Sequence, residues 1–314
     1  MLAELLRACD RPDESLEPLI MHNVNELLPA AASGTADSPV PLKLVRGLAD
    51  VVLEAGRRAH AMFRSDVRSW KKHGDSIVCD ADIAVDALLS ERLSALGPEH
   101  GWFSEETVDA PVRLGRSTLW VVDPIDGTRA FLAGDADWVV SVALVAGDRP
   151  IAAALHAPVS DELFVAALGR GATLNGKRIG AGGSSSLVGA RITGPRPMLD
   201  QLARIENGFV RVPRIRSLAL RLARVATGEL DAAVASGNSN DWDLAAADLL
   251  LHEAGGILSE IDGSIPRYNA PRSVHGPLAA AGRHLHPTLL HALAKAMQPS
   301  DQAQDEDRKG NAAS

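Results

Sequence analysis

Two aspartates, Asp123 and Asp126, close an apolar, strand-like run that begins at Trp120. A strand with this pattern can carry both carboxylates to the edge of a sheet. Pro124 restricts the backbone between them, and Gly127 permits a tight turn with close approach of a ligand. Carboxylate and carbonyl oxygens are the ligands that hard cations such as Mg²⁺ prefer. The run therefore indicates a metal site rather than a simple Asp-Gly turn.

Two further acidic clusters have the same character. Glu105 and Glu106 follow an apolar stretch upstream, and Asp243 lies at the expected start of a helix that should stop at Gly255-Gly256. Taken alone, the glutamate pair could be a solvated face, and Asp243 could be no more than a helix N-cap. The three clusters together favour a shared role in holding a cation.

These clusters resemble the motifs of the inositol monophosphatase superfamily of Mg²⁺-dependent, lithium-sensitive phosphatases. The matching pieces are Ser104-Glu105-Glu106, Asp123-Pro124-Ile125-Asp126-Gly127-Thr128, Trp242-Asp243 with the helix end at 253–256, and Asp80-Ala81-Asp82 ahead of a helix expected at 83–96. The resemblance extends over residues 42–293, and this order of motifs is far more specific than any one of them. It implies an α+β fold, a layered α/β/α/β/α sandwich of the inositol monophosphatase/fructose-1,6-bisphosphatase type.

The resemblance also implies roles for individual residues. Two or three Mg²⁺ ions would be held by four carboxylates and one main-chain carbonyl, those of Glu105, Asp123, Asp126, Asp243 and Ile125. Thr128 would hydrogen-bond Asp82, and this pair with Glu105 would position and deprotonate the attacking water. The backbone at Gly127 and Thr128 would meet the substrate phosphate. A homodimer is the assembly that the resemblance implies.

The chemistry is consistent with this assignment. A phosphate monoester carries about two negative charges near neutral pH, so an acidic pocket would repel it without cations. Bound Mg²⁺ reverses the local charge and lowers the pKa of a bound water. No side-chain nucleophile is evident: Cys9 and Cys79 have no CxxC partner, and the histidines show no HExxH spacing.

Four positions bear on the substrate. Arg129 resembles the basic residue that follows the motif threonine in relatives cleaving 3′-phosphoadenosine 5′-phosphate, although Ala130 replaces their usual glutamate. Ser236 stands seven residues before the last metal aspartate, where inositol enzymes have a glutamate that bonds inositol hydroxyls. Arg221 lies about where bacterial bisphosphate nucleotidases carry a lysine, and could pair with a second phosphate. Its alternative interpretation is a surface or helix-terminal charge.

The favoured function is a 3′(2′),5′-bisphosphate nucleotidase that converts 3′-phosphoadenosine 5′-phosphate to AMP. An inositol-1-phosphatase, a broad sugar-phosphate phosphatase and a histidinol-phosphate phosphatase remain open, because the metal motifs are explicit and the specificity loops are not. A role in binding RNA or transcription machinery, as in some relatives, also stays open. Tyr268 could stack on adenine or could be a core aromatic.

Composition favours a cytoplasmic enzyme acting on a small phosphorylated substrate, with neither nucleic acid nor membrane as partner. The chain has 314 residues, 46% of them hydrophobic, and a net charge of −8 that argues weakly against nucleic-acid binding. Two cysteines form no disulfide framework. No apolar run approaches the ~20 residues that span a bilayer. Charged residues at Glu4, Arg7 and Asp10 exclude a signal-peptide core.

Four segments organise the chain. We expect an N-terminal extension and linker at 1–40, an α+β half with the metal motifs at 41–187, an α/β half at 188–296, and a disordered tail at 297–314. The periodicity predicts a helix running from Pro41 past Ala55, strands at 139–145, 151–158, 163–167 and 188–194, a hairpin turn at Asn175-Gly176, and helices at 198–205 and 217–227.

Overall fold

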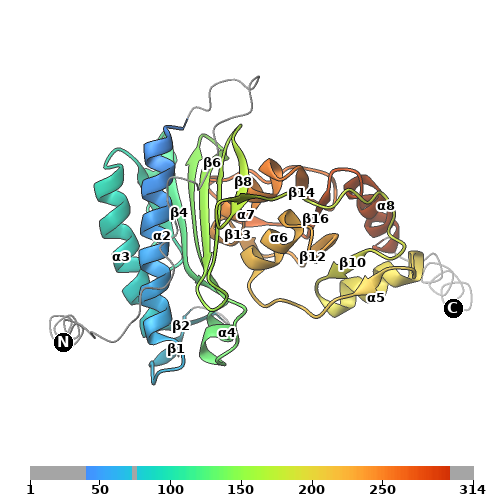
Figure 1. Ribbon diagram of the computed structural model, residues 1–314, viewed down its shortest axis with the longest axis horizontal. Helices are drawn as coiled ribbons and strands as arrows, with labels where there is room; N and C mark the ends of the chain where they lie inside the picture. The colour runs from blue at the N-terminus through green and yellow to red at the C-terminus, as the bar shows by residue number, and fades with distance from the viewer. Residues whose placement is uncertain (1–39, 73–75, 298–314) are drawn as a thin grey trace, which may run out of the picture.

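The computed structural model describes residues 40–72 and 76–297. In this part of the chain, helices and two main sheets stack in five layers, helix, sheet, helix, sheet, helix (Figure 1). The layered α/β/α/β/α arrangement expected from the sequence is therefore confirmed. The extension predicted for 1–40 and the tail predicted for 297–314 lie outside the described residues, except for Val40 and Met297.

The larger sheet has seven strands within the described residues, in the order β3-β4-β5-β6-β7-β8-β9. Their bounds are β3 (Gly101–Ser104), β4 (Thr118–Asp126), β5 (Val139–Ala146), β6 (Arg149–Ala157), β7 (Glu162–Ala167), β8 (Gly171–Leu174) and β9 (Lys177–Arg178). β3 and β4 are parallel, and the other neighbours are antiparallel. The predicted hairpin turn joins β8 to β9, with φ of 49° at Asn175 and 75° at Gly176, as a primed turn requires.

Two helices, α2 (Leu42–Met62) and α3 (Asp80–Leu96), cover the outer face of this sheet (Figure 1). α2 packs so closely on β6 that a Cβ at Gly56 would lie only 1.9 Å from the Nδ1 atom of His156. A glycine is therefore required at this contact. α3 begins three residues earlier than the sequence predicted. The Asp82 carboxylate accepts a 2.8 Å hydrogen bond from the amide of Cys79, the N-cap, and so stabilises the start of α3 at Asp80. A hairpin of β1 (Ser69–Lys71) and β2 (Ile77–Cys79) precedes α3.

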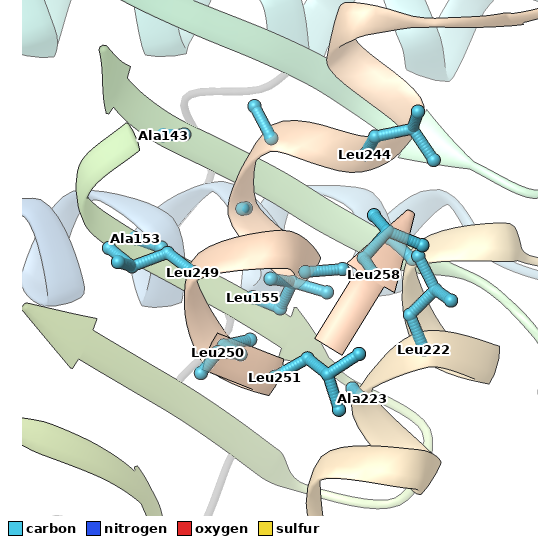
Figure 2. Close-up of a cluster of buried hydrophobic side chains, with 14 of the residues drawn as sticks. Ala143, Ala153, Leu155, Leu222, Ala223, Leu244, Leu249, Leu250, Leu251 and Leu258 are labelled. Atoms are coloured by element: carbon cyan, nitrogen blue, oxygen red, sulfur yellow. The ribbon is translucent and has the colours of Figure 1, made fainter. Parts of the chain in front are cut away.

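The central layer consists of α6 (Leu218–Ala226) and α7 (Asp241–Glu253). α7 is apolar around most of its circumference, which suits a helix packed between two sheets. Figure 2 shows Leu249 beside Leu155 of the larger sheet, whereas Leu251 lies near Ala223 of α6. Alanines such as Ala153 keep the helix close to the strands. The inner core thus joins the two halves of the molecule.

The smaller sheet has five strands in the described part, ordered β11-β10-β12-β16-β14. They are β10 (Arg191–Thr193), β11 (Val210–Arg211), β12 (Ala232–Ala235), β14 (Gly256–Glu260) and β16 (Leu278–Gly282). α5 (Arg196–Ile205) and α8 (His286–Ala296) cover its outer face (Figure 1). Shorter elements complete the fold, namely α4 (Thr128–Leu132), η2 (Pro111–Gly115), β13 (Ser239–Asn240) and β15 (Val274–His275).

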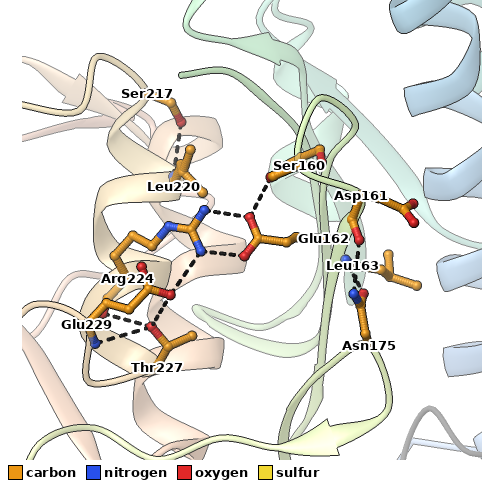
Figure 3. A network of polar contacts seen from close by, with 11 residues as sticks. Ser160, Asp161, Glu162, Leu163, Asn175, Ser217, Leu220, Arg224, Thr227 and Glu229 are labelled. Atoms are coloured by element: carbon orange, nitrogen blue, oxygen red, sulfur yellow. Dashed lines mark hydrogen bonds and ion pairs between the residues drawn. The ribbon is translucent and has the colours of Figure 1, made fainter. Parts of the chain in front are cut away.

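An ion pair links the central layer to the larger sheet. Arg224 of α6 donates from Nη1 to the Glu162 carboxylate of β7 at 2.6 Å, and Ser160 donates to the same carboxylate (Figure 3). Both charged side chains are mostly buried. Among the described helices, none is both long and apolar enough to cross a bilayer.

Candidate metal centre

A bulge in β4 turns both motif aspartates to the same side of the sheet. Asp123 pairs with Ser141 and Asp126 with Val139, so Pro124 and Ile125 together oppose the single residue Val140. In a regular strand, residues three apart point to opposite faces, and one extra residue reverses that parity. Proline has no N–H for the ladder, which favours a bulge here. The Asp123 carboxylate closes the turn by accepting from the Ile125 amide at 3.0 Å.

Glu105 and Asp243 reach the same place from two other elements. Glu105 follows β3, and its amide donates to the Val122 carbonyl of β4 at 3.2 Å, which sets it beside Asp123. Asp243 lies in the first turn of α7, where its carboxylate accepts from the Asn240 amide at 2.6 Å. Asn240 is therefore the N-cap, and Asp243, the third residue of the helix, completes the capping box rather than being the cap that the sequence suggested.

Asp123, Asp126 and Asp243 each bring an oxygen within 4.8 Å of the others. They line a cavity of about 710 Å³ together with Glu105 and Ile125. All the ionisable donors are carboxylates, the set that suits a hard divalent cation. The five ligands expected from the sequence thus surround one cavity, although Glu105 lies outside the tight group of three.

Burial and mutual repulsion disfavour the ionised form of these carboxylates. Burial, with repulsion from Glu105 and Asp126, raises the pKa of Asp123 well above its usual value. Burial raises the pKa of Glu105 from 4.5 to about 8, although the nearby Lys72 ammonium opposes the shift. Burial, with the charge of Asp126, raises the pKa of Asp243 from 3.8 to about 7. A bound cation would reverse each of these effects, so the cluster fits a metal site.

The hydrogen bond expected between Thr128 and Asp82 is present. Thr128 Oγ1 lies 3.1 Å from Asp82 Oδ1 and 3.1 Å from the Ile125 carbonyl oxygen. Asp82 is buried, and burial raises the pKa of its carboxyl. The other Asp82 oxygen caps α3, so the helix start holds the carboxylate in one orientation. The pair therefore places a fixed hydroxyl in the wall of the cavity, with a buried carboxylate behind it.

Gly127 occupies a position that excludes a side chain. Its φ is 103°, and a Cβ there would meet the Asp137 carbonyl oxygen at 2.6 Å. The residue lines the cavity together with Thr128, as expected for a backbone surface that meets a phosphate. The prediction that the amides at these two positions bind substrate remains a prediction.

Two residues that the sequence analysis missed hold parts of the cluster. Ser217, the N-cap of α6, donates from Oγ to Asp126 Oδ2 at 2.6 Å, and the Ala219 amide donates to the same oxygen at 2.6 Å. Lys72 lies 3.9 Å from Glu105 Oε1 and forms an ion pair with Glu106. A serine before an apolar helix is a recognisable cap signal, but its link to Asp126 is not readable locally.

Three arginines line the cavity in addition to the acidic residues. Arg129, which the sequence singled out, lines it together with Arg214 and Arg216, which it did not. The Arg-x-Arg spacing just ahead of the Ser217 cap was the available signal. Arg216 donates to the Arg129 carbonyl at 3.3 Å and lies 3.4 Å from the Asp135 carboxylate.

Arg221 is buried and is therefore not the surface charge that the sequence allowed as an alternative. It is 2% exposed and donates to the backbone carbonyls of Ile215 and Val234. Burial, aided by repulsion from Arg214, lowers the pKa of its guanidinium to about 10. Tyr268 is also buried, with its hydroxyl 2.9 Å from Asp248, so it is a core aromatic and not a stacking platform.

Comparison with known proteins gives a consistent result. Residues 40–298 match the model of the inositol monophosphatase family. Inositol monophosphatase 2 of Solanum lycopersicum is 33% identical over 262 residues, covering 78% of this chain and 97% of the relative. The extragenic suppressor protein suhB from Bartonella henselae has a TM-score of 0.72 at 26% identity, covering 80% of this chain and 98% of that one. An IMPase/NADP phosphatase complexed with Mg²⁺ and phosphate has a TM-score of 0.68 at 22% identity, over 76% and 91% of the two chains.

Proposed function

This chain belongs to the inositol monophosphatase family of phosphatases, and from that premise we propose a Mg²⁺-dependent hydrolysis of phosphate monoesters by water. The observation that carries the proposal is the convergence of Asp123, Asp126 and Asp243 within 4.8 Å. Two or three Mg²⁺ ions would be held by these residues with Glu105 and the Ile125 carbonyl. When bound, they would neutralise the phosphate charge and lower the pKa of water.

The remaining steps fall to side chains of this chain. Thr128 and Asp82 would orient the attacking water, with the Thr128 hydroxyl donating to Asp82 Oδ1 and its oxygen free to accept from the water. Glu105, which lines the same cavity, would take the proton of that water at a carboxylate oxygen. The amides of Gly127 and Thr128 would donate to the phosphate oxygens.

For the substrate we propose a 3′(2′),5′-bisphosphate nucleotide. The reaction would convert 3′-phosphoadenosine 5′-phosphate to AMP. The support is a cavity that is acidic at the cluster and basic beyond it, where Arg129, Arg214 and Arg216 lie. Ser236, in place of a carboxylate, borders the adjoining space. A substrate with a second phosphate complements that polarity, whereas a neutral polyol does not.

Inositol 1-phosphate is the second candidate. Its support is the name of the tomato relative, an inositol monophosphatase that is 33% identical to this chain. Broad sugar-phosphate and histidinol-phosphate hydrolysis are further alternatives within the same chemistry. Each would use the same metal cluster and differ only in what contacts the leaving alcohol.

Phosphate release with Mg²⁺ separates these candidates. 3′-Phosphoadenosine 5′-phosphate, inositol 1-phosphate and histidinol phosphate are compared at equal concentration. We expect kcat/KM for the nucleotide to exceed the others by about 100-fold, equivalent to ~2.7 kcal/mol. An equal or larger value for inositol phosphate would overturn the nucleotide assignment and leave the metal chemistry intact.

Lithium sensitivity and a cytoplasmic homodimer also belong to the proposal. Millimolar lithium should inhibit turnover, and lithium-insensitive activity would argue against the proposed metal arrangement. A homodimer in the cytoplasm is the expected state, which light scattering and cell fractionation would test.

A binding role independent of catalysis is an alternative to this proposal. It would gain support if a cellular phenotype survived Asp123→Asn.

A further inference from the structure

A second chamber opens beside the metal cluster. Its volume is about 260 Å³, and it is lined by residues 235–239, Pro195, Leu218 and three arginines, Arg214, Arg216 and Arg221. Asp126, Asp243, Arg214 and Arg216 also line the larger cavity, so the two spaces adjoin. A liquid water molecule occupies about 30 Å³, so the chamber has room for a phosphate group with its hydration.

Arg214 is the side chain in this chamber that a ligand could reach most directly. It is exposed, and no carboxylate among the described residues pairs with it. Arg216, by comparison, already lies 3.4 Å from Asp135. The nearby carboxylate of Asp126 is held by Ser217 and Ala219 through one of its oxygens. The guanidinium of Arg214 is therefore available to an incoming anion.

Arg221 fixes the segment that carries the other two arginines. Its Nε and Nη2 atoms donate to the Ile215 carbonyl at 3.1 and 2.7 Å, and Ile215 lies between Arg214 and Arg216. Its Nη1 atom donates to the Val234 carbonyl of β12, and residues 235–239, which line the chamber, directly follow Val234. Arg221 thus positions the segment at 214–216 and contributes a buried positive charge to the chamber wall.

We infer that this chamber binds a second phosphate group of the substrate. Arg214 contacts that phosphate, and the buried Arg221 adds positive charge to the chamber wall. The inference rests on the proposed phosphatase function and specifies where its substrate is recognised. Two like charges that face one cavity are stabilised when an anion lies between them. Arginine forms bidentate hydrogen bonds to phosphate oxygens, which adds directionality to the charge. A neutral leaving group would leave Arg214 without a partner.

Two nucleotides that differ only in the second phosphate test the inference. Adenosine 3′,5′-bisphosphate and adenosine 3′-monophosphate share the scissile ester, so the ratio of their kcat/KM values isolates the contribution of the 5′-phosphate. We expect the native enzyme to prefer the bisphosphate by about 10- to 100-fold, the range of a charge-assisted hydrogen bond. Arg214→Gln should reduce that ratio to near one, and Arg214→Lys should restore part of it.

Arg196→Gln is the matched control, because this arginine is 91% exposed on α5, lies 3.8 Å from Asp200 and is not itself among the residues that line the chamber. It should leave the ratio unchanged. Adenosine 5′-monophosphate, the product of the proposed reaction, supplies a binding readout, since it keeps the 5′-phosphate and lacks the 3′-phosphate that is cleaved. Calorimetry should show that Arg214→Gln weakens its binding about tenfold or more, with a native circular dichroism spectrum as the folding check.

The outcomes distinguish the inference from the function on which it rests. Equal kcat/KM for the two nucleotides, or an equal loss on both in Arg214→Gln, would overturn the chamber assignment while hydrolysis stood. Absence of phosphate release from any monoester would overturn the proposed function. In that case, unchanged binding of adenosine 5′-monophosphate by Arg214→Gln would overturn the inference too, and weakened binding would support it.

Discussion

Pro124 removes one backbone donor from β4 at the point where the strand must change parity. The bulge that follows turns Asp126 to the same face as Asp123, and Asp243 comes within 4.8 Å of both. At the scale of single residues, the site is a set of carboxylates whose repulsion is tolerated because the backbone holds them. The free energy that opposes this arrangement should be recovered when a cation binds.

Asp123→Asn should abolish phosphate release and preserve the fold. The carboxylate is buried among other carboxylates, so its removal deletes a metal ligand and also relieves repulsion. The metal-free variant should therefore melt at or above the temperature of the metal-free native protein. Steady-state kinetics and thermal unfolding in EDTA measure the two effects. Asp66→Asn, at an exposed position, is the control and should change neither.

The metal-free protein should lose stability as the pH rises from about 4 to about 8. The folded-state pKa of Glu105 is raised from 4.5 to about 8, and that of Asp243 from 3.8 to about 7, both chiefly by burial. Between these limits the folded state binds more protons than the unfolded chain, so unfolding becomes easier at higher pH. Melting temperatures in EDTA at several pH values check this.

Added Mg²⁺ should reverse the slope, because the cation binds the ionised carboxylates. Glu105→Gln should reduce the slope of the metal-free profile, most of all toward pH 8, since it removes the group whose pKa is raised to about 8. A metal-free melting temperature that stayed level or increased toward pH 8 would contradict the account of the cluster.

At the scale of elements, the start of α6 is coupled to the metal cluster. Ser217 accepts from the Leu220 amide at 3.0 Å, which caps the helix (Figure 3), and donates to Asp126. One hydroxyl thus caps the start of the helix and orients a ligand that lies 91 residues earlier in the chain. The capping box of α7 does the same for Asp243, so two helix starts position two ligands.

Ser217→Ala should weaken metal binding more than it weakens folding. Loss of the cap should cost about 1 kcal/mol of unfolding free energy. Loss of the hydrogen bond that orients Asp126 should raise the apparent dissociation constant for Mg²⁺ by about 10- to 100-fold. Calorimetric Mg²⁺ titration and urea denaturation measure these separately. Ser184→Ala, in an exposed loop, should leave both unchanged, and an unaltered Mg²⁺ affinity in Ser217→Ala would refute the coupling.

The Arg224–Glu162 pair should stabilise the packing of α6 against β7. Burial raises the pKa of Glu162, but the hydrogen bonds from Arg224 and Ser160 outweigh it, and the net pKa is lowered. Its contribution is therefore present above the unfolded-state pKa and is lost as the pH falls through the folded-state value. Either single change, Arg224→Met or Glu162→Gln, should cost about 1–3 kcal/mol, and a double-mutant cycle in urea should show positive coupling. Strict additivity would exclude a direct contribution.

At the scale of the whole molecule, α6 and α7 form a layer that both sheets share. Leu250 of α7 is fully buried in a cluster that includes residues of both sheets (Figure 2). The halves proposed at 41–187 and 188–296 therefore lack separate cores on this side. We expect them to unfold as one cooperative unit.

Leu250→Ala should destabilise the protein by about 2–5 kcal/mol, because it leaves a cavity in a core that cannot fully collapse. Tryptophan fluorescence and far-ultraviolet circular dichroism should give coincident urea transitions for both the native protein and the variant. Leu114→Ala, at a partly exposed position, should cost far less. Two separated transitions would show that the halves unfold independently.

Much of this protein was readable along the chain. Hydrophobic periodicity and turn residues indicated α2, β5 to β7, the Asn175-Gly176 hairpin and α5 to α7, because these signals act over a few residues. The order of acidic motifs indicated the residues that gather at the cavity. Helix starts were less accurate, as at Asp80 and Asn240, because the capping hydrogen bonds could not be assigned from spacing alone.

The surroundings of the cluster were decided only by the tertiary structure. Lys72 contacts Glu105, Ser217 contacts Asp126 and Arg214 lines the same cavity as those carboxylates, although each lies far from its neighbour in the sequence and no local pattern indicates the contact. Arg221 shows the limit most directly, because helical spacing placed it correctly on α6 and could not tell that packing buries it. Local patterns determine which elements form and which ligands they carry. Side-chain exposure and the choice of which cations face a substrate depend on how distant layers pack.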